Sequence, residues 1–306
     1  MPRIPRQVVH YSRLNPETSQ GGVESFARNL RLSFEQVELM TPETRDEERV
    51  RRERLPVICD NQLVLDFPPD IPVIGFRHGV AWRKVQVTRS LHDLGLAAKQ
   101  LRAARRPNVT WVSCARWIER AFAGVARAPS AGVIYHPVDL ERFDGRLDNA
   151  GSKLVLHDAR SEHKGQRLIA ALAAALPQYR FEALACPSEQ VPERMRGAAA
   201  FLHLSRYEGN SIVCNEAMAM NLPCLFTRVG LMLDADQRFD VELVEPAQAF
   251  RDPAALLQRV TQFLSSLPER QYRPRTWVTE HASIEATQAA WARCIAELER
   301  SGWSRG

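Results

Sequence analysis

FLHLSRYEGNSIVCNEAMAMNLPCLFTRVG, residues 201–230, reads in order as an apolar strand, a loop, a helix, a proline-containing turn and a second apolar strand. Short apolar runs on either side of a longer helical pattern are typical of parallel strands joined through a helix. In a parallel α/β sheet, ligands bind at the carboxyl ends of the strands. The segment therefore predicts an α/β fold and places Glu208, in the loop after the first strand, at a candidate binding edge.

The helix of this segment is expected to offer an anion site at its start. Asn210 or Ser211 can cap it, which leaves the N–H groups of its first turn facing the binding edge. Such a helix end suits a diphosphate. The helix is apolar nearly all round, so Glu216, about one and a half turns in, needs donors such as ribose or sugar hydroxyls. From these residues alone, a loop charge at Glu208 and a buried structural acid at Glu216 fit equally well.

The same alternation of strands and helices runs through the whole chain of 306 residues. In the first part, strands are expected at 7–12, 36–41, 55–67, 71–76 and 108–114, and helices at 23–34 and about 85–106. A second alternation starts at residue 153, and apolar residues recur at helical spacing near the end of the chain. The pattern predicts two domains, residues 1–137 and 138–306, with a helix at about 283–300 that can pack back on the first domain.

Three other stretches carry polar groups next to predicted strand ends. LVLHDARSEHKGQRL (154–168) places Arg160 and Lys164 where two cations could neutralise a diphosphate, although a solvated run of charges explains them as well. TSQGGVESFARNL (18–30) holds Gly21 and Gly22 between a strand and a helix, where backbone can approach a ligand or simply turn. VIGFRHGVAWRK (73–84) places His78 after a strand, and a lone histidine is more often structural than catalytic.

The 201–230 segment resembles the donor-binding segment of GT-B retaining glycosyltransferases, the group 1 or family 4 type. Their pattern is S-x-x-E-G, seven residues between two glutamates, and then E-A-M-A-x-G-x-P. This chain reads SRYEG and, further on, NEAMAMNLP, with Asn221 where glycine is usual. Asparagine also adopts left-handed backbone conformations, so the turn can be kept.

The resemblance implies two Rossmann-like parallel α/β domains that face each other across a cleft, and it assigns roles to the residues quoted above. In the donor domain, Glu216 is expected to hold the ribose hydroxyls, and Glu208 to face the donor sugar. The backbone amides of Gly209, Asn210 and Ser211 are expected to approach the phosphate or the sugar.

Arg160 and Lys164 resemble the pair that grips the donor phosphates, with Ala159 in place of a glycine and a gap one residue shorter than usual. Gly21 and Gly22 resemble the glycine loop that closes over the donor phosphate from the first domain. His78 stands where the family often places a histidine near the reacting centre, so it is included as an acceptor-side or sugar-contacting residue.

By this resemblance the chain is a retaining glycosyltransferase that moves a sugar from a nucleotide-diphosphate sugar to an acceptor hydroxyl. A bacterial cell-surface polysaccharide, lipopolysaccharide or glycolipid is the expected acceptor class, and neither a metal ion nor another cofactor is expected. A sugar-nucleotide 2-epimerase of the same fold and a non-catalytic nucleotide-sugar-binding relative are the alternatives. A nucleic-acid partner is not expected, because no recognised motif supports it and basic residues are sparsely interleaved with aromatic ones.

Charge and composition bear on partners and location. Hydrophobic residues make up 45% of the chain and net charge is +5, but residues 1–137 hold 21 Lys and Arg against 14 Asp and Glu. This half, and the basic and aromatic stretch 99–127 in particular, suggests peripheral contact with an anionic membrane, or else an ordinary solvated surface. No apolar run of membrane-spanning length or secretory signal is recognised, and six scattered cysteines favour a reduced, cytoplasmic setting.

Overall fold

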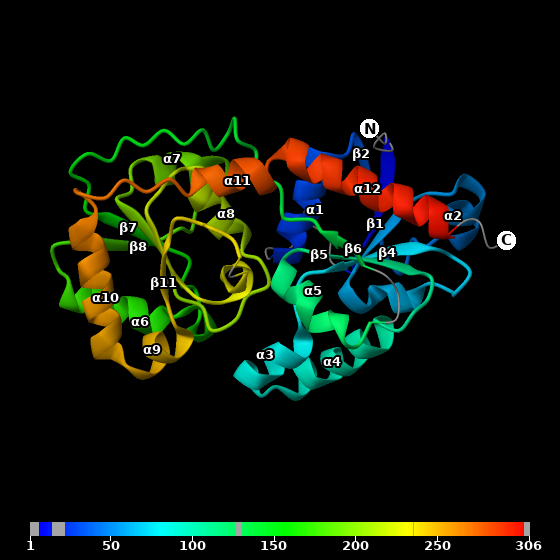
Figure 1. Cartoon of the computed structure of the whole chain (residues 1–306), viewed down its shortest axis with the longest axis horizontal. Coiled ribbons are helices and arrows are strands. Elements are labelled where there is room, and N and C mark those ends of the chain that lie inside the picture. The colour runs from blue at the N-terminus through cyan, green and yellow to red at the C-terminus, as the bar shows by residue number, and fades with distance from the viewer. Residues whose placement is uncertain (1–5, 14–21, 127–129, 235, 303–306) are drawn as a thin grey trace. The chain divides into compact units, whose positions relative to one another are not determined.

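A computed structural model describes residues 6–13, 22–126, 130–234 and 236–302 of the chain, and Figure 1 shows its elements. The chain forms two compact units. Unit 1 comprises Met1–Pro137 and Ile284–Gly306, and unit 2 comprises Val138–Ser283. The chain thus leaves unit 1 after Pro137 and returns to it after Ser283. An isolated β-bridge between Val138 and Ser283, both in unit 2, pairs the two points where the chain crosses.

Unit 1 contains a six-stranded sheet in the order β2-β1-β3-β4-β5-β6, with every pairing parallel. The central strands are buried along their whole length, as is usual for a parallel sheet covered on both faces. The strands are β1 Gln7–Tyr11, β2 Gln36–Met40, β3 Val57–Asp60, β4 Val73–Arg77, β5 Val109–Ser113 and β6 Ser130–Val133. The helices are α1 Gly22–Ser33, α2 Glu47–Glu53, the 3-10 helix η1 Asn61–Asp66, α3 Ala81–Thr88, α4 Leu91–Ala103, α5 Arg116–Ala123 and α12 Ile284–Gly302.

Two elements of unit 1 differ from the sequence-based prediction. The strand expected over 55–67 ends at Asp60, because Asn61 adopts a left-handed φ of 47° and starts the 3-10 helix η1. The single helix expected over about 85–106 is two helices, α3 and α4. Arg89 is left-handed with φ 52°, and the Ser90 side chain then caps α4 by accepting from the amide of Asp93.

Helix α12 completes the core of unit 1. It packs against α1, β4, β5 and β6, and its course beside α1 can be followed in Figure 1. Trp291 on α12 is 1% exposed, and its ring contacts those of Phe34 and Phe76 at centroid distances of 5.5 and 5.7 Å. The last helix of the described chain is therefore part of the first unit's hydrophobic core.

Unit 2 contains a five-stranded parallel sheet in the order β11-β10-β9-β7-β8. Strands β7, β9 and β10 are fully buried, so helices cover both of their faces. The strands are β7 Leu154–His157, β8 Arg180–Ala183, β9 Ala200–His203, β10 Cys224–Thr227 and β11 Glu242–Val244. The α-helices are α6 Gln166–Ala175, α7 Val191–Arg196, α8 Ile212–Ala219, α9 Pro246–Arg251, α10 Pro253–Ser266 and α11 Arg275–His281, and the 3-10 helices are η2 Glu162–Lys164, η3 Ser188–Gln190 and η4 Gly230–Leu233.

The structure also bears on the expectations about the cysteines and about membrane-spanning segments. All six cysteines have free thiols, and five of them are buried. Among the described residues, no helix combines the length and the apolar character needed to span a bilayer.

Candidate functional site

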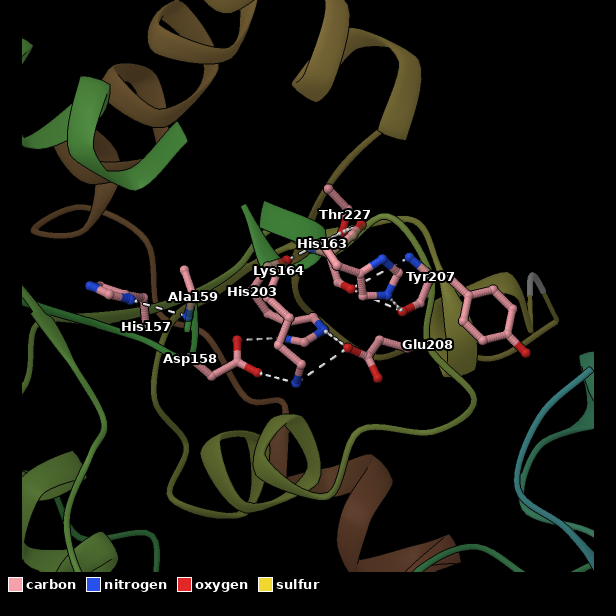
Figure 2. A network of polar contacts seen from close by, with 10 residues as sticks. His157, Asp158, Ala159, His163, Lys164, His203, Tyr207, Glu208 and Thr227 are labelled. Atoms are coloured by element: carbon pink, nitrogen blue, oxygen red, sulfur yellow. Dashed lines mark hydrogen bonds and ion pairs between the residues drawn. The ribbon is translucent and has the colours of Figure 1, made fainter. Parts of the chain in front are cut away.

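Four charged side chains meet at the carboxyl edge of the unit 2 sheet. Asp158 follows β7, Lys164 ends η2, His203 ends β9, and Glu208 lies in the loop after β9. Figure 2 shows Lys164 and His203 lying between the carboxylates of Asp158 and Glu208. We call these four residues the charge ring. Because β7 and β9 are neighbouring parallel strands, their carboxyl ends bring the four side chains together although the residues are far apart in sequence.

The ring is closed by two strong and two longer contacts. Asp158 accepts from Lys164 Nζ at 2.9 Å through one oxygen and pairs with His203 Nδ1 at 2.7 Å through the other. Glu208 Oε1 lies 3.4 Å from Lys164 Nζ and 3.5 Å from His203 Nε2, which are ion-pair distances. Asp158 and His203 are almost completely buried, whereas the side chains of Lys164 and Glu208 are 29% and 18% exposed. The exposed members of the ring are therefore the two predicted from sequence.

Burial and pairing act in opposite directions on these groups. Burial alone would raise the pKa of Asp158 and lower that of His203, but their mutual attraction holds the Asp158 pKa below its usual range and raises the His203 pKa well above its own. Burial would also lower the pKa of Lys164, and the carboxylates of Glu208 and Asp158 raise it instead. His203 is thus an imidazolium with both ring nitrogens directed at carboxylates, and the ring carries two positive and two negative charges.

Two loops that bear the ring are tied to each other. His163 Nε2 lies 3.0 Å from the carbonyl oxygen of Tyr207 (Figure 2), and the His163 carbonyl accepts from the amide of Arg206. Gly165 has φ +74°, and a Cβ there would lie 2.4 Å from the carbonyl oxygen of Leu204. Only glycine allows the loop after Lys164 to approach β9 this closely. The contact fixes the distance between Lys164 and Glu208.

Glycine is also required on the other side of Glu208. Gly230 has φ +58°, and a Cβ there would lie 2.8 Å from the Cβ of Glu208. A pocket next to it is lined by His203, Glu208, Ser211, Cys214, Phe226, Val229, Leu231 and Met232. Two members of the charge ring, His203 and Glu208, therefore line this pocket together with mainly apolar side chains.

Helix α8 begins beside this pocket. Ser211 holds the N-cap position, and its side chain makes no capping hydrogen bond, although its carbonyl oxygen accepts from the Cys214 amide. The helix is buried on most sides, as its composition predicted, and Glu216 on it is partly buried. Asn221, after the helix, has φ 60°, which confirms the left-handed turn expected there. The start of α8 therefore adds amide donors to the cations of the ring.

The other residues predicted for the donor site differ in their exposure and in whether the structure describes them. Arg160 follows β7 and is exposed, with no side-chain ion pair to the described residues. Gly209 and Asn210 precede the α8 N-cap, and Asn210 is 8% exposed. Gly22 is the first residue of α1, whereas Gly21 lies outside the described residues.

His78 belongs to a different cluster, at the carboxyl edge of the unit 1 sheet. Its Nε2 lies 2.8 Å from Asp60 Oδ1, and the same oxygen lies 3.1 Å from His10 Nε2. His136 stacks on His78 with a centroid distance of 6.1 Å and an angle of 15° between the rings. The His136 side chain is 3% exposed.

Sequence reasoning did not single out Asp60, His10, Asp158 or His203. Each is a polar residue within or directly after a short apolar strand, where a strand residue would ordinarily be apolar. This position was a usable signal, since buried polar groups need partners. Their pairing was not readable, because it joins residues that are 45 or more positions apart.

The comparison with family models bears on unit 2. Residues 152–266 match the model described as Glycosyl transferases group 1. This segment, which makes up most of unit 2, is therefore similar to the group 1 glycosyltransferases. This match covers the charge ring, the pocket and helix α8, and it agrees with the resemblance found for the 201–230 segment. No curated protein sequence matches the chain.

Solved glycosyltransferase structures share the fold of the whole chain. Sucrose-phosphate synthase from Thermosynechococcus elongatus is 16% identical with a TM-score of 0.73, over 97% of this chain and 100% of that one. HepE from Anabaena, solved in complex with UDP, is 14% identical with a TM-score of 0.70, over 96% and 100% of the two chains. WaaG, a glycosyltransferase involved in lipopolysaccharide biosynthesis, is 15% identical with a TM-score of 0.59, over 98% and 100%. These likenesses confirm the predicted GT-B fold.

Proposed function

We propose that this glycosyltransferase binds a nucleotide-diphosphate sugar in unit 2 and transfers the sugar with retention of its anomeric configuration. The observation that carries the proposal is the charge ring beside the start of α8. Lys164 and the amides of α8 supply positive charge at one edge, and the partly exposed Glu208 offers an acceptor for sugar hydroxyls. HepE has been solved with UDP and with UDP-glucose, which supports a nucleotide sugar as the donor.

The reaction would use these charges on the leaving group. As the bond from the anomeric carbon to the phosphate oxygen breaks, negative charge builds up on the diphosphate, and Lys164 and Arg160 would stabilise it. The acceptor hydroxyl would attack the same face of the sugar, and its proton would pass to the leaving phosphate oxygen. Such a front-face path needs no carboxylate nucleophile and returns the original configuration. The acceptor would be a hydroxyl of a glycan or glycolipid.

Product stereochemistry tests this path. The protein is incubated with UDP-glucose, an α-linked donor, and the first-formed sugar product is followed by proton NMR before it mutarotates. Retention predicts an α-configured product. A β-configured product would show that the reaction inverts and would overturn the proposed mechanism.

The proposed stabilisation of the diphosphate does not rely on a metal ion. Within the described residues, no group of three or more His, Cys, Asp or Glu side chains is arranged to hold one. Lys164 and the α8 amides would take the role that a divalent cation has elsewhere. Turnover is therefore expected to be unchanged after dialysis against EDTA, and restoration of lost activity by Mg²⁺ or Mn²⁺ would contradict this.

Two further measurements separate the alternative activities. A sugar-nucleotide 2-epimerase would convert UDP-N-acetylglucosamine to its epimer without an acceptor, whereas a transferase would not. A non-catalytic relative would bind the nucleotide sugar and release neither sugar nor nucleotide. Binding is measured as a rise in the thermal unfolding temperature during a screen of UDP-, GDP- and ADP-sugars.

We also propose that helices α3 and α4 contact an anionic membrane surface. Val87, Leu91 and Leu94 on these helices are 38%, 85% and 55% exposed. Residues 81–106 hold seven Lys and Arg against one acidic residue, Asp93, which is buried and paired with Lys84 at 2.9 Å. Exposed leucines beside this excess of basic residues suit the interface of an anionic bilayer.

This surface differs from the stretch suggested by sequence. Within residues 99–127, the aromatic side chains Trp111, Trp117 and Phe122 are 2%, 8% and 2% exposed, so they belong to the core of unit 1. Sedimentation with phosphatidylglycerol vesicles should exceed that with phosphatidylcholine vesicles, and replacing both Leu91 and Leu94 with Ser should lower it. Equal sedimentation with both vesicle types would remove the proposal.

A further inference from the structure

The histidine cluster of unit 1 is centred on Asp60. This residue ends β3, which lies between β1 and β4 in the sheet, so His10 of β1 and His78 after β4 approach it from both sides. The side chains of His10 and Asp60 are 1% and 7% exposed, whereas that of His78 is 13% exposed. Of the three, His78 is the member nearest to solvent.

The positions of the protons follow from Asp60. Burial alone would raise the pKa of its carboxyl, but the two imidazoles lower it below its usual range, so the carboxyl is ionised. An ionised carboxylate only accepts hydrogen bonds, so Nε2 of His10 and Nε2 of His78 must both carry hydrogens. In neutral His78, the other ring nitrogen, Nδ1, then carries a lone pair.

The ring of His78 has little freedom to move. The side-chain oxygen of Asn61 accepts from the His78 amide at 3.0 Å, and the Gln100 amide donates to the Gly79 carbonyl at 3.2 Å. The ring itself contacts those of Phe26, Phe76 and His136. Backbone and ring are therefore held by side chains from four other segments, which is how a binding group is kept in one geometry.

Three other polar atoms of this cluster, His10 Nδ1, Asp60 Oδ2 and His136 Nδ1, also lack a hydrogen-bond partner within the described residues, but they are buried. Nδ1 of His78 belongs to the most exposed side chain of the Asp60 group and is the atom that a ligand can reach. It makes no hydrogen bond to any of the described residues. The neighbouring His136 contributes no charge, because burial first and His78 second lower its pKa to about 3. A lone pair in a partly exposed, aromatic setting close to an ionised carboxylate suits a neutral hydrogen-bond donor rather than an anion.

We propose that Asp60 is a positioning residue that fixes His78 as the Nε2–H tautomer, so that Nδ1 accepts a hydrogen bond from a hydroxyl group of a carbohydrate bound at this edge of the unit 1 sheet. This inference rests on the proposed function for the identity of the ligand. The assignment of the tautomer rests on the structure of unit 1 alone. Asparagine at position 60 would keep the shape but could also donate to Nε2, and so would admit the other tautomer, as is known for carboxylate–histidine pairs.

The tautomer is measured by two-bond hydrogen–nitrogen NMR on the full chain with labelled histidine, and the His78 signals are assigned with His78→Gln. Wild type is expected to show hydrogen on Nε2 and a lone pair on Nδ1. Asp60→Asn should shift His78 toward hydrogen on Nδ1. Asp66→Asn is the matched control, because its carboxylate bonds Tyr11 and Arg13 rather than a histidine. His10→Gln keeps the Asp60 contact to His78 and should keep the tautomer, which covers the case in which Asp60→Asn does not fold.

Kinetics then test whether Asp60 acts through His78. With UDP-glucose as the probe, Asp60→Asn and His78→Gln should each lower turnover about tenfold, the effect of one lost hydrogen bond. The double variant should be no slower than His78→Gln, since a residue that acts only through His78 has nothing left to position. Asp66→Asn should turn over UDP-glucose at the wild-type rate.

Two results would overturn the inference. The first is hydrogen on Nδ1 of His78 in the wild-type protein, and the second is additive losses in the double variant, which would make Asp60 a structural residue. Failure of the wild type to turn over any nucleotide sugar would instead reject the proposed function. The NMR measurement needs no substrate, so it still decides the role of Asp60 in that case.

Discussion

Lys164 lies between two carboxylates, and its charge is balanced before any ligand binds. Burial would favour the neutral amine, but Glu208 and Asp158 raise its pKa, so it stays charged at neutral pH. A diphosphate that approached Lys164 would compete with Glu208 at 3.4 Å, the longer of its two contacts. Lys164 can therefore turn toward a ligand while Asp158 still holds it at 2.9 Å.

Replacing Lys164 with Ala should lower sugar transfer by about 10²- to 10³-fold, the usual effect of removing one group that stabilises developing negative charge. The far-ultraviolet circular dichroism spectrum should be unchanged, because the fold does not depend on this exposed edge. Lys153→Ala is the control, since Lys153 is exposed at the opposite end of β7 and lies over the Tyr179 ring. Wild-type turnover in Lys164→Ala would reject the assignment of the donor site.

His203 makes the stability of the chain depend on pH. Its pKa in the folded state is raised above the ordinary value of 6.5, so its stabilising effect is complete below that value and is lost as pH rises through the folded pKa. Asp158 has the opposite sign, because its pKa is lowered from 3.8, and its contribution is lost as pH falls below that value. The pair stabilises most strongly between the two ordinary values.

His203→Gln should therefore reduce the free energy of unfolding most near pH 6, and the difference from wild type should shrink toward about pH 9. Urea unfolding at several pH values measures it for both proteins. Stability curves that run parallel from pH 6 to about pH 9 would show that His203 does not titrate in this window.

At the scale of elements, the loop between β7 and α6 depends on one glycine. Gly165→Ala must place a methyl group against the Leu204 carbonyl in addition to keeping φ +74°. Gly151→Ala is a matched control, because Gly151 has φ +71° and open space around its Cβ position. Gly151→Ala should cost about 1 kcal/mol from backbone strain alone, and Gly165→Ala should cost clearly more.

Both variants can be compared by urea unfolding and by turnover. Because Gly165 follows Lys164 directly, its replacement should also displace Lys164 and lower transfer, whereas Gly151→Ala should leave transfer unchanged. Equal stability and equal activity in the two variants would show that the loop can move away from β9 without consequence.

The elements also show how far the sequence could predict the fold. Apolar runs located β1 to β5 of the first sheet and β9 and β10 of the second, since buried parallel strands need apolar residues on both faces. The break between α3 and α4 was missed because apolar spacing continues through it. Ser90 with Asp93 three residues later was an available capping signal. The end of β3 was not readable, because nothing in the residues before Asn61 requires its left-handed conformation.

Some residues of the candidate site could likewise be predicted from the sequence, and others could not. Glu208, Glu216 and Lys164 were predicted because each lies in one continuous, densely patterned segment. Asp158 and His203 were missed, because their roles come from a pairing between neighbouring strands that only the folded sheet creates. Local patterns thus predicted the more exposed groups, and the buried groups that pair with them required the structure.

At the scale of the whole molecule, Trp291 tests the division into units. The ring is buried against Phe34 and Phe76 in unit 1, so Trp291→Ala should reduce the free energy of unfolding by about 3–5 kcal/mol. Arg293→Ala, on an exposed position of the same helix, should change it by less than about 0.5 kcal/mol. Hydrogen exchange should show faster exchange in unit 1 for Trp291→Ala, and a uniform response in both units would argue against separate cores.

The return of the chain to unit 1 after Ser283 also sets an order of events during synthesis. All of unit 2 leaves the ribosome before α12 does, so the surface of α1 and β4 that Trp291 covers stays open to solvent for that time. At roughly 5–20 residues per second, the interval lasts on the order of ten seconds or more. Unit 2, in contrast, is continuous and can close its own core first. Unit 1 therefore cannot complete its core until α12 has been synthesised. A chaperone that binds exposed aromatic surface would be expected to act on the nascent chain in that interval.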